Sequence, residues 1–342
     1  SGAAVAAGFA PAAIGTETNG SIICPSSLMG LVGLKPTVGL VPRTHVVPIS
    51  HSQDTAGPMT HDVRDAAILL SVLIASDPAD PATADAKAHA HDYAAALDPA
   101  AIKGMRIGVM RGIEQPALIA LYDAALARLT ALGAVLVEVE KPNMDAMRAA
   151  SGTVLNAEFK TDLNAYLAST DPAKVESRTL ADLIAFNNAH ANREMPLFGQ
   201  ELFEKAQAGT GAADPAYAEA RDKAKRLAGP EGIDAMLAAH KVDLLLTISY
   251  GPAWISDTLY GDNYPGPRGS TSMAAIAGYP HLTVPMGQVR GLPVGLSFIG
   301  AAYDEQRLLN AGYAFEQAQG LKLRPDFRPT ADVGPELEPV QP

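Results

Sequence analysis

A strand–helix–strand pattern between residues 105 and 140 constrains the fold most strongly. Residues 105–110 form a short apolar run, residues 118–132 carry apolar side chains at helical spacing, and residues 134–140 alternate between apolar and polar. Two strands joined by a helix in this way pair in parallel within one sheet. The pattern therefore predicts an α/β protein whose central sheet contains parallel strands.

The rest of the chain supplies further strands and many helices. Asp62 is expected to cap a helix, and residues 76–100, rich in Asp-Pro, are expected to form a surface excursion. We predict one large α/β domain over residues 1–342, with a helix-rich elaboration at about 147–237. Strands are predicted at 242–248, 282–286 and 294–299, with a turn at 291–293, and helices at 1–14, 63–74 and 305–319.

Composition and charge narrow the possible ligands. Asp and Glu outnumber Lys and Arg by 37 to 26, giving a net charge of −11, and no basic run is present. The phosphate-neutralising surface of a nucleic-acid binder is therefore not expected. No apolar run reaches the roughly 18 residues that a membrane span requires. We expect a small-molecule or peptide ligand, with no nucleic acid and no membrane as partner.

Residues 15–25, GTETNGSIICP, present one serine, Ser21, in a turn of small and polar residues. Glycine lets the main chain approach a ligand closely, and consecutive N–H groups in such a turn can point into one concavity that stabilises an anion. Ser21 is therefore the candidate nucleophile. Polar turns of this kind also occur without any catalytic role, and that interpretation stays open from this segment alone.

Other polar and aromatic residues allow both structural and functional interpretations. Asp54 could be a catalytic carboxylate, but it is interpreted mainly as structural, holding the loop at residues 52–57 through side-chain-to-backbone hydrogen bonds. Tyr250 and Trp254 follow a predicted strand, where they either line a substrate pocket or anchor a long loop. The single cysteine, Cys24, lies in an apolar stretch and is expected to be a buried structural thiol.

No metal site is predicted. His45, His51 and His61 lie near Asp54 in the sequence, and His89 and His91 are two residues apart. The chain nevertheless lacks the cysteines or the tight histidine and carboxylate cluster that a metal centre needs. Motifs such as GxSxG, the P-loop, HExxH and GxGxxG after a strand are absent as well.

Several motifs resemble those of the amidase signature family, in the right order and across almost the whole chain. They are GTETNGSI at 15–22, GLKPT at 33–37, DTAGPM at 54–59, GYP at 278–280, LTVP at 282–285 and GLPVGL at 291–296. Within the family, the stretches at 52–58, 197–202 and 226–234 look most like the bacterial peptide amidases, which remove the C-terminal amide of peptides and release ammonia. Asn19 departs from the usual glycine, and Ile23 replaces the common arginine.

The resemblance implies a mixed central β-sheet flanked by helices on both faces, and a Ser, cis-Ser, Lys triad without a cofactor. Ser21 matches the nucleophile, and the N–H groups of Thr18, Asn19, Gly20 and Ser21 would stabilise the oxyanion. The family's cis-serine and lysine fall upstream of Ser1, so the chain is expected to lack its N-terminal part. Neither Ser1 nor Lys35 matches the missing residues.

Two other hypotheses stay open. The chain could belong to another amidase branch, including the glutaminase-type subunit of a tRNA amidotransferase. Because two triad members are absent from the sequence, it could instead be a non-catalytic fragment or inactive homologue that only binds. The sequence identifies neither the compartment, cytoplasmic or periplasmic, nor the oligomeric state.

Overall fold

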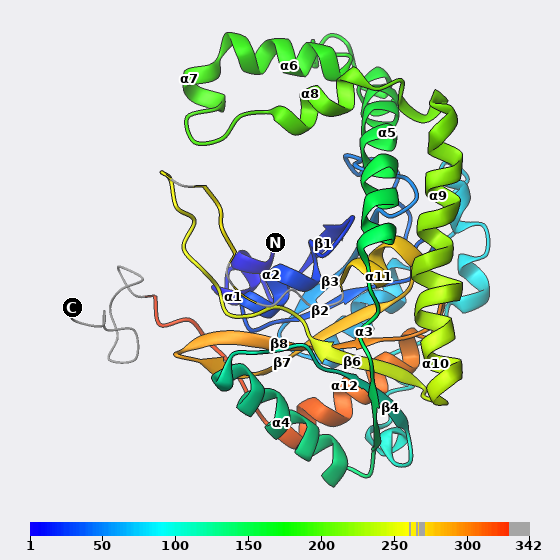
Figure 1. Ribbon diagram of the computed structural model, residues 1–342, viewed down its shortest axis with the longest axis vertical. Coiled ribbons are helices and arrows are strands. Elements are labelled where there is room, and N and C mark those ends of the chain that lie inside the picture. The colour runs from blue at the N-terminus through cyan, green and yellow to red at the C-terminus, as the bar shows by residue number, and fades with distance from the viewer. Residues whose placement is uncertain (260, 265, 267–270, 328–342) are drawn as a thin grey trace.

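A computed structural model describes residues 1–259, 261–264, 266 and 271–327. Its centre is an eight-stranded sheet in the order β1-β3-β2-β7-β8-β6-β4-β5 (Figure 1). Strand β4 pairs in parallel with β5 and β6, and the remaining neighbours pair antiparallel. The strands are β1 (Ala12–Glu17), β2 (Val32–Lys35), β3 (Thr55–Thr60), β4 (Arg106–Met110), β5 (Val135–Val139), β6 (Leu244–Ile248), β7 (His281–Val289) and β8 (Leu292–Ile299).

Helices cover both faces of this sheet, as predicted. Strand β6 shows how the faces are divided, because Leu244 and Leu246 pack into one apolar core while Leu245 packs into the other. The first core includes α3, α4 and α12, and the second includes α9 and α11. The longer helices are α3 (Val63–Leu73), α4 (Pro116–Ala131), α5 (Asp145–Ser169), α6 (Leu180–Ala189), α8 (Glu201–Ala208), α9 (Pro215–Ala228) and α12 (Glu305–Gln319).

Short helices complete the structure. They are α1 (Gly2–Ala6), α2 (Ile23–Leu28), α7 (Ala191–Glu194), α10 (Ala235–His240) and α11 (Thr271–Ala277), the 3-10 turns η1 (Pro81–Thr83), η2 (Ala86–His89), η3 (Pro99–Ile102) and η4 (Gly211–Ala213), and the π-helical turn η5 (Gly229–Asp234). Asp62 caps α3 as predicted, because its side chain accepts a hydrogen bond from the N–H of Asp65. Among the described residues, no helix is both long and apolar enough to cross a membrane.

The predicted strand–helix–strand unit is confirmed, with β4 and β5 parallel in register from Arg106 to Met110. The helix predicted at 1–14 is wrong beyond Ala6, because the chain forms β1 and pairs with β3. Alanine favours helix only weakly, and pairing with a neighbouring strand overrides that preference. The turn between β7 and β8 lies at Arg290 and Gly291, both with positive φ, one or two residues before its predicted place.

The sequence also did not predict β2 and β3. Their residues are rich in glycine and proline, which usually mark turns. Glycine is required here, because a Cβ on Gly57 would lie 2.1 Å from the carbonyl oxygen of Leu34 on the neighbouring strand. Close backbone approach therefore explains why turn-like residues occupy buried strands.

The helix-rich segment at 147–237 is present, and part of it stands away from the sheet. Helices α6, α7 and α8 lie at the far end of α5 (Figure 1). They surround a small separate apolar cluster that includes Leu163, Leu167, Leu180 and Ala206. We refer to α6, α7 and α8 as the helical arm.

Glu316 on α12 should make the stability of the fold pH-dependent. Its carboxylate accepts a hydrogen bond from the N–H of Val63 at the start of α3, and burial raises its pKa from 4.5 to about 7. The folded chain therefore binds a proton that the unfolded chain releases, so the free energy of unfolding falls as the pH rises from 4.5 to 7. Glu316→Gln should remove about 1 to 3 kcal/mol of this fall, measured by urea denaturation at pH 5 and 8. The exposed control Glu114→Gln should retain it, and an unchanged fall in Glu316→Gln would contradict the assignment.

Candidate active site around Ser21

The turn that carries Ser21 connects β1 to α2. Gly20 has a φ of 93°, a left-handed conformation that strongly favours glycine. Ser21 is exposed, whereas Ile22 and Ile23, which follow it, are fully buried. The two isoleucines thus anchor the turn in the core and leave the Ser21 side chain at the surface.

A buried carboxylate at the end of β1 fixes this turn from inside. Glu17 is 1% exposed, and its Oε2 accepts hydrogen bonds from the N–H groups of Ile22 at 2.9 Å and Ile23 at 3.0 Å. Its Oε1 is buried without a hydrogen-bond partner among the described residues. The sequence motif included Glu17 but assigned it no role. Its place at the end of a strand, directly before a turn whose N–H groups need acceptors, could have indicated this role.

Removing Glu17 should destabilise the fold in a way that identifies its hydrogen bonds. Glu17→Ala leaves two buried N–H groups unpaired and should lower the free energy of unfolding by about 2 to 4 kcal/mol. Glu17→Gln keeps an oxygen for both donors and should cost clearly less. Urea denaturation of the two variants provides the measurement. Equal losses in both would show that the carboxylate does not act through these N–H groups.

The preceding N–H groups of the turn are not bonded in this way. Within the described part of the chain, those of Asn19, Gly20 and Ser21 donate to no protein acceptor. They are among the four donors predicted for an oxyanion. The hydroxyl of Ser21 also has no hydrogen-bond partner among the described residues.

The polar side-chain atoms of Lys35 and Ser1 bond to main-chain carbonyls and not to Ser21. Lys35 is fully buried, and its amine donates to the carbonyl of Pro36 at 2.9 Å. Burial lowers its pKa to about 8, while the charges of Glu17 and Glu305 oppose that shift. The hydroxyl of Ser1 donates to the carbonyl of Ile14 at 2.8 Å.

Of the two candidate pocket aromatics, the structure brings Tyr250 to the turn. A Cβ built on Gly20 would lie 3.8 Å from the Tyr250 hydroxyl and 3.6 Å from Thr271 Oγ1. Thr271, the first residue of α11, is buried and was not anticipated. Trp254 instead packs on Tyr264, with ring centroids 4.5 Å apart, and its indole N–H donates to Asp262.

Cys24 is half-buried and hydrogen-bonds Tyr250. Burial, with the nearby charge of Glu17, raises its thiol pKa from 9.0 to about 11.

Because the thiolate is the reactive form, Cys24 should react with iodoacetamide at pH 8 about 100-fold more slowly than a free cysteine. Mass spectrometry of the alkylated chain follows the rate, and the urea-unfolded chain serves as the fast-reacting control. Equal rates in the folded and unfolded chains would contradict this environment.

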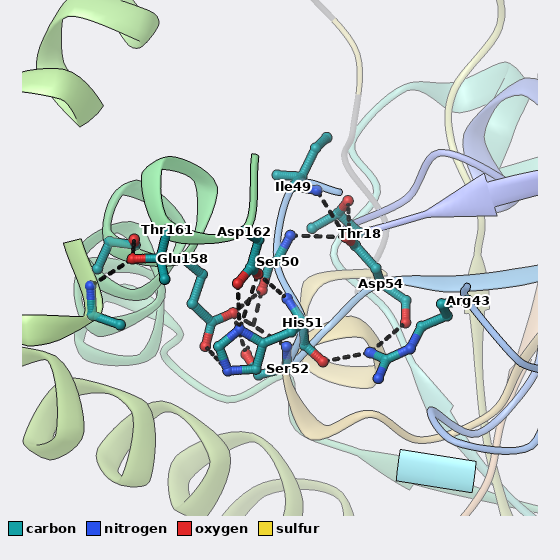
Figure 2. Close-up of polar contacts among 12 residues, drawn as sticks. Thr18, Arg43, Ile49, Ser50, His51, Ser52, Asp54, Glu158, Thr161 and Asp162 are labelled. Carbon is teal, nitrogen blue, oxygen red and sulfur yellow. Dashed lines mark hydrogen bonds and ion pairs between the residues drawn. The ribbon is translucent and has the colours of Figure 1, made fainter. Parts of the chain in front are cut away.

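Asp54 connects the turn to a neighbouring loop at residues 49–54. Its Oδ1 accepts a hydrogen bond from Thr18 Oγ1 at 2.5 Å, and its Oδ2 accepts from the N–H groups of Ile49 and Ser50, both at 2.8 Å (Figure 2). Asp54 therefore holds residues 49 and 50 through side-chain-to-backbone hydrogen bonds. The predicted bonds within residues 52–57 are not the ones it makes. Burial raises the pKa of Asp54, and the bond from Thr18 opposes that shift.

A cluster on α5 meets the same loop and was not predicted. Glu158 and Asp162 of α5 approach His51, with Glu158 Oε1 3.3 Å from Nε2 and Asp162 Oδ2 2.9 Å from Nδ1 (Figure 2). One ligand atom from each residue could in principle reach a metal ion, since these atoms lie within 4.8 Å of one another. The same atoms already bond to one another and to the loop, which accounts for the cluster as an ion-pair network. The sequence did not indicate this cluster, because α5 begins about 90 residues after the loop.

Comparison with known proteins agrees with this fold. The family model described as Amidase matches residues 1–309. The native peptide amidase of Stenotrophomonas maltophilia is 50% identical, with a TM-score of 0.88 over 96% of this chain and 66% of that one. A glutamyl-tRNA(Gln) amidotransferase subunit from Rhodospirillum rubrum is 36% identical over 95% of this chain and 65% of its own length. A protein of Arabidopsis thaliana named as a probable amidase is 34% identical over 94% and 60%.

The chain belongs to the amidase family, which confirms the resemblance drawn from its motifs. It spans about 60 to 65% of the length of these curated relatives. The mixed sheet with helices on both faces is the fold that the family resemblance implied.

Proposed function

We propose that the protein is a serine-dependent amidase that hydrolyses a carboxamide, the C-terminal amide of a peptide, to a carboxylate and ammonia. The observation that carries the proposal is the exposed Ser21 beside three N–H groups that no described residue occupies. The likeness to peptide amidases supports the substrate class. A crystal structure of the peptide amidase PAM, 51% identical to this chain, contains the competitive inhibitor chymostatin.

In the proposed reaction, Ser21 Oγ attacks the amide carbonyl carbon and forms a tetrahedral intermediate. Backbone N–H groups of residues 18–21 stabilise the oxyanion, each effective donor contributing about 10² to 10³ in rate. Collapse of the intermediate breaks the C–N bond, and the nitrogen leaves as ammonia after receiving a proton. Water then attacks the acyl-enzyme and releases the carboxylate.

A serine hydroxyl needs a base, and no described residue bonds to Ser21 Oγ. The proposal therefore assigns the proton transfers to a lysine and a bridging cis-serine outside residues 1–342, as the family resemblance implies. It treats these residues as part of a single amidase domain with the helix-rich elaboration at 147–237.

Replacing the nucleophile tests this function in the full-length gene product. Ser21→Ala should abolish ammonia release from a peptide amide, a loss of at least about 10³-fold, while circular dichroism shows an intact fold. Ser169→Ala, at an exposed position near the end of α5, is the matched control and should retain full activity. Undiminished turnover in Ser21→Ala would refute the proposal.

A second candidate rests on the relatives named as subunits of glutamyl-tRNA(Gln) amidotransferase. The same chemistry would then act on free glutamine and deliver ammonia to a partner protein. A strong preference for glutamine over peptide amides, together with co-purification of a partner, would favour this function.

A binding-only role would instead be favoured if the gene product had a mass near 35.5 kDa and hydrolysed neither substrate.

A further inference from the structure

We propose that Glu158 is a positioning residue, which sets the conformation of the turn at 18–21 through the loop at residues 49–54. The consequence for catalysis rests on the proposed function of Ser21, whereas the mechanical connection does not. The path runs from Glu158 to Ser50, from Ser50 to Asp54, and from Asp54 to Thr18, which lies three residues before Ser21 (Figure 2).

The first step of the path is the bonding of Glu158, whose side chain is fully buried. Its Oε2 accepts hydrogen bonds from Ser50 Oγ, from the Ser52 N–H at 3.2 Å and from Ser52 Oγ at 2.9 Å. Its Oε1 accepts from the Tyr217 hydroxyl of α9 at 2.6 Å. The carboxylate therefore joins two helices to one loop.

Ser50 donates hydrogen bonds to both carboxylates, that of Asp54 and that of Glu158. Its N–H donates to Asp54 Oδ2, while its hydroxyl donates to Glu158 Oε2. A shift of Ser50 must therefore alter the bonds of Asp54, whose other oxygen holds Thr18. Because all four groups are buried, water cannot readily replace a lost bond.

Polar contacts, not apolar packing, give this loop its shape. The side chain of Ile49 is 46% exposed, and the buried side chains of Ser50 and Gln53 are polar. On the opposite side, the Arg43 guanidinium donates to the carbonyls of His51 and Asp54. Because polar contacts rather than apolar packing hold the loop, removing a buried one should change its position.

His51 lies between Glu158 and Asp162, and in its protonated form it balances part of their negative charge. The bond to Asp162 raises the pKa of His51, and the charge of Glu158 adds to this shift, while burial and Arg43 oppose it. The other titratable or charged groups near His51 and Glu158 are Asp54, the Tyr217 hydroxyl and Arg221. Tyr217 and Arg221 both belong to α9, and they contact each other.

Small displacements of the turn matter because oxyanion stabilisation depends on donors held at hydrogen-bond distance. Thr18 precedes the three available N–H groups of Asn19, Gly20 and Ser21. Loosening Thr18 should therefore reduce the rate of the chemical step more than the binding of substrate.

Hydrogen exchange of the whole chain, read by mass spectrometry, tests the connection without any activity measurement. Glu158→Ala should speed exchange about tenfold in peptides covering both 47–55 and 16–24. Glu158→Gln keeps an acceptor for the serines and should stay near the unmodified protein. Glu219→Ala, on the exposed face of α9, removes the same charge and should change neither peptide.

Ser50→Ala removes only the hydroxyl that bonds Glu158 and keeps the N–H that bonds Asp54. It therefore tests the connection between Glu158 and the turn if Glu158→Ala does not fold. It should speed exchange in both peptides. Faster exchange at 47–55 with unchanged exchange at 16–24 in a folded variant would overturn the proposal.

Kinetics of the full-length gene product test the catalytic consequence. With a peptide amide, Glu158→Ala or Ser50→Ala should lower kcat about tenfold and leave KM within about twofold, and Glu158→Gln should recover most of the loss. An unchanged kcat, or an equal loss in Glu158→Gln, would overturn the positioning role. If Ser21→Ala retained activity, the proposed function would fail, while the exchange experiment would still judge the connection.

Discussion

The hydrogen bonds that Glu17 accepts from the N–H groups of Ile22 and Ile23 are the interaction on which the Ser21 turn depends. A buried carboxylate is costly unless donors surround it. Two N–H donors compensate for part of that cost, and the buried amine of Lys35 lies near enough for Glu17 to raise its pKa against the effect of burial. Glu17 thus satisfies the N–H groups of Ile22 and Ile23 inside the core, while the side chain of Ser21, just before them, stays exposed.

The same device recurs at other loops. Asp54 and Glu158 hold the loop at 49–54, and Glu305 of α12 accepts bonds from the N–H and the hydroxyl of Thr37, just after β2. In each case a buried carboxylate satisfies donors of a segment that has little regular structure. These bonds explain how a chain with frequent glycine and proline around its site holds fixed turns there.

Sequence reasoning was most successful where local pattern and tertiary structure agree. The unit of β4, α4 and β5, and the bounds of α12, follow from periodicity alone. It failed for β1, whose alanines suggested helix, and for β3, whose glycine and proline suggested a turn, because only the neighbouring strands make these segments extended. For the site, the polar turn and the motif matches indicated Ser21, and the place of Tyr250 after a strand left its pocket and loop-anchoring roles open. Thr271 and Glu158 come from distant segments. Their approach to the turn depends on how the helices pack, which no local pattern records.

Two requirements of the proposed amide hydrolysis are structurally separate in this protein. Stabilising an oxyanion requires N–H groups in a fixed geometry, which Glu17, Asp54 and Gly20 establish within the described residues. Activating the serine requires a base, and no described residue contacts the Ser21 hydroxyl. Because the geometry of the turn relies on core contacts and not on the base, it can form before any proton relay is in place. In the proposed reaction these N–H groups act mainly once the proton has moved, because only then does the carbonyl oxygen carry the charge that they stabilise.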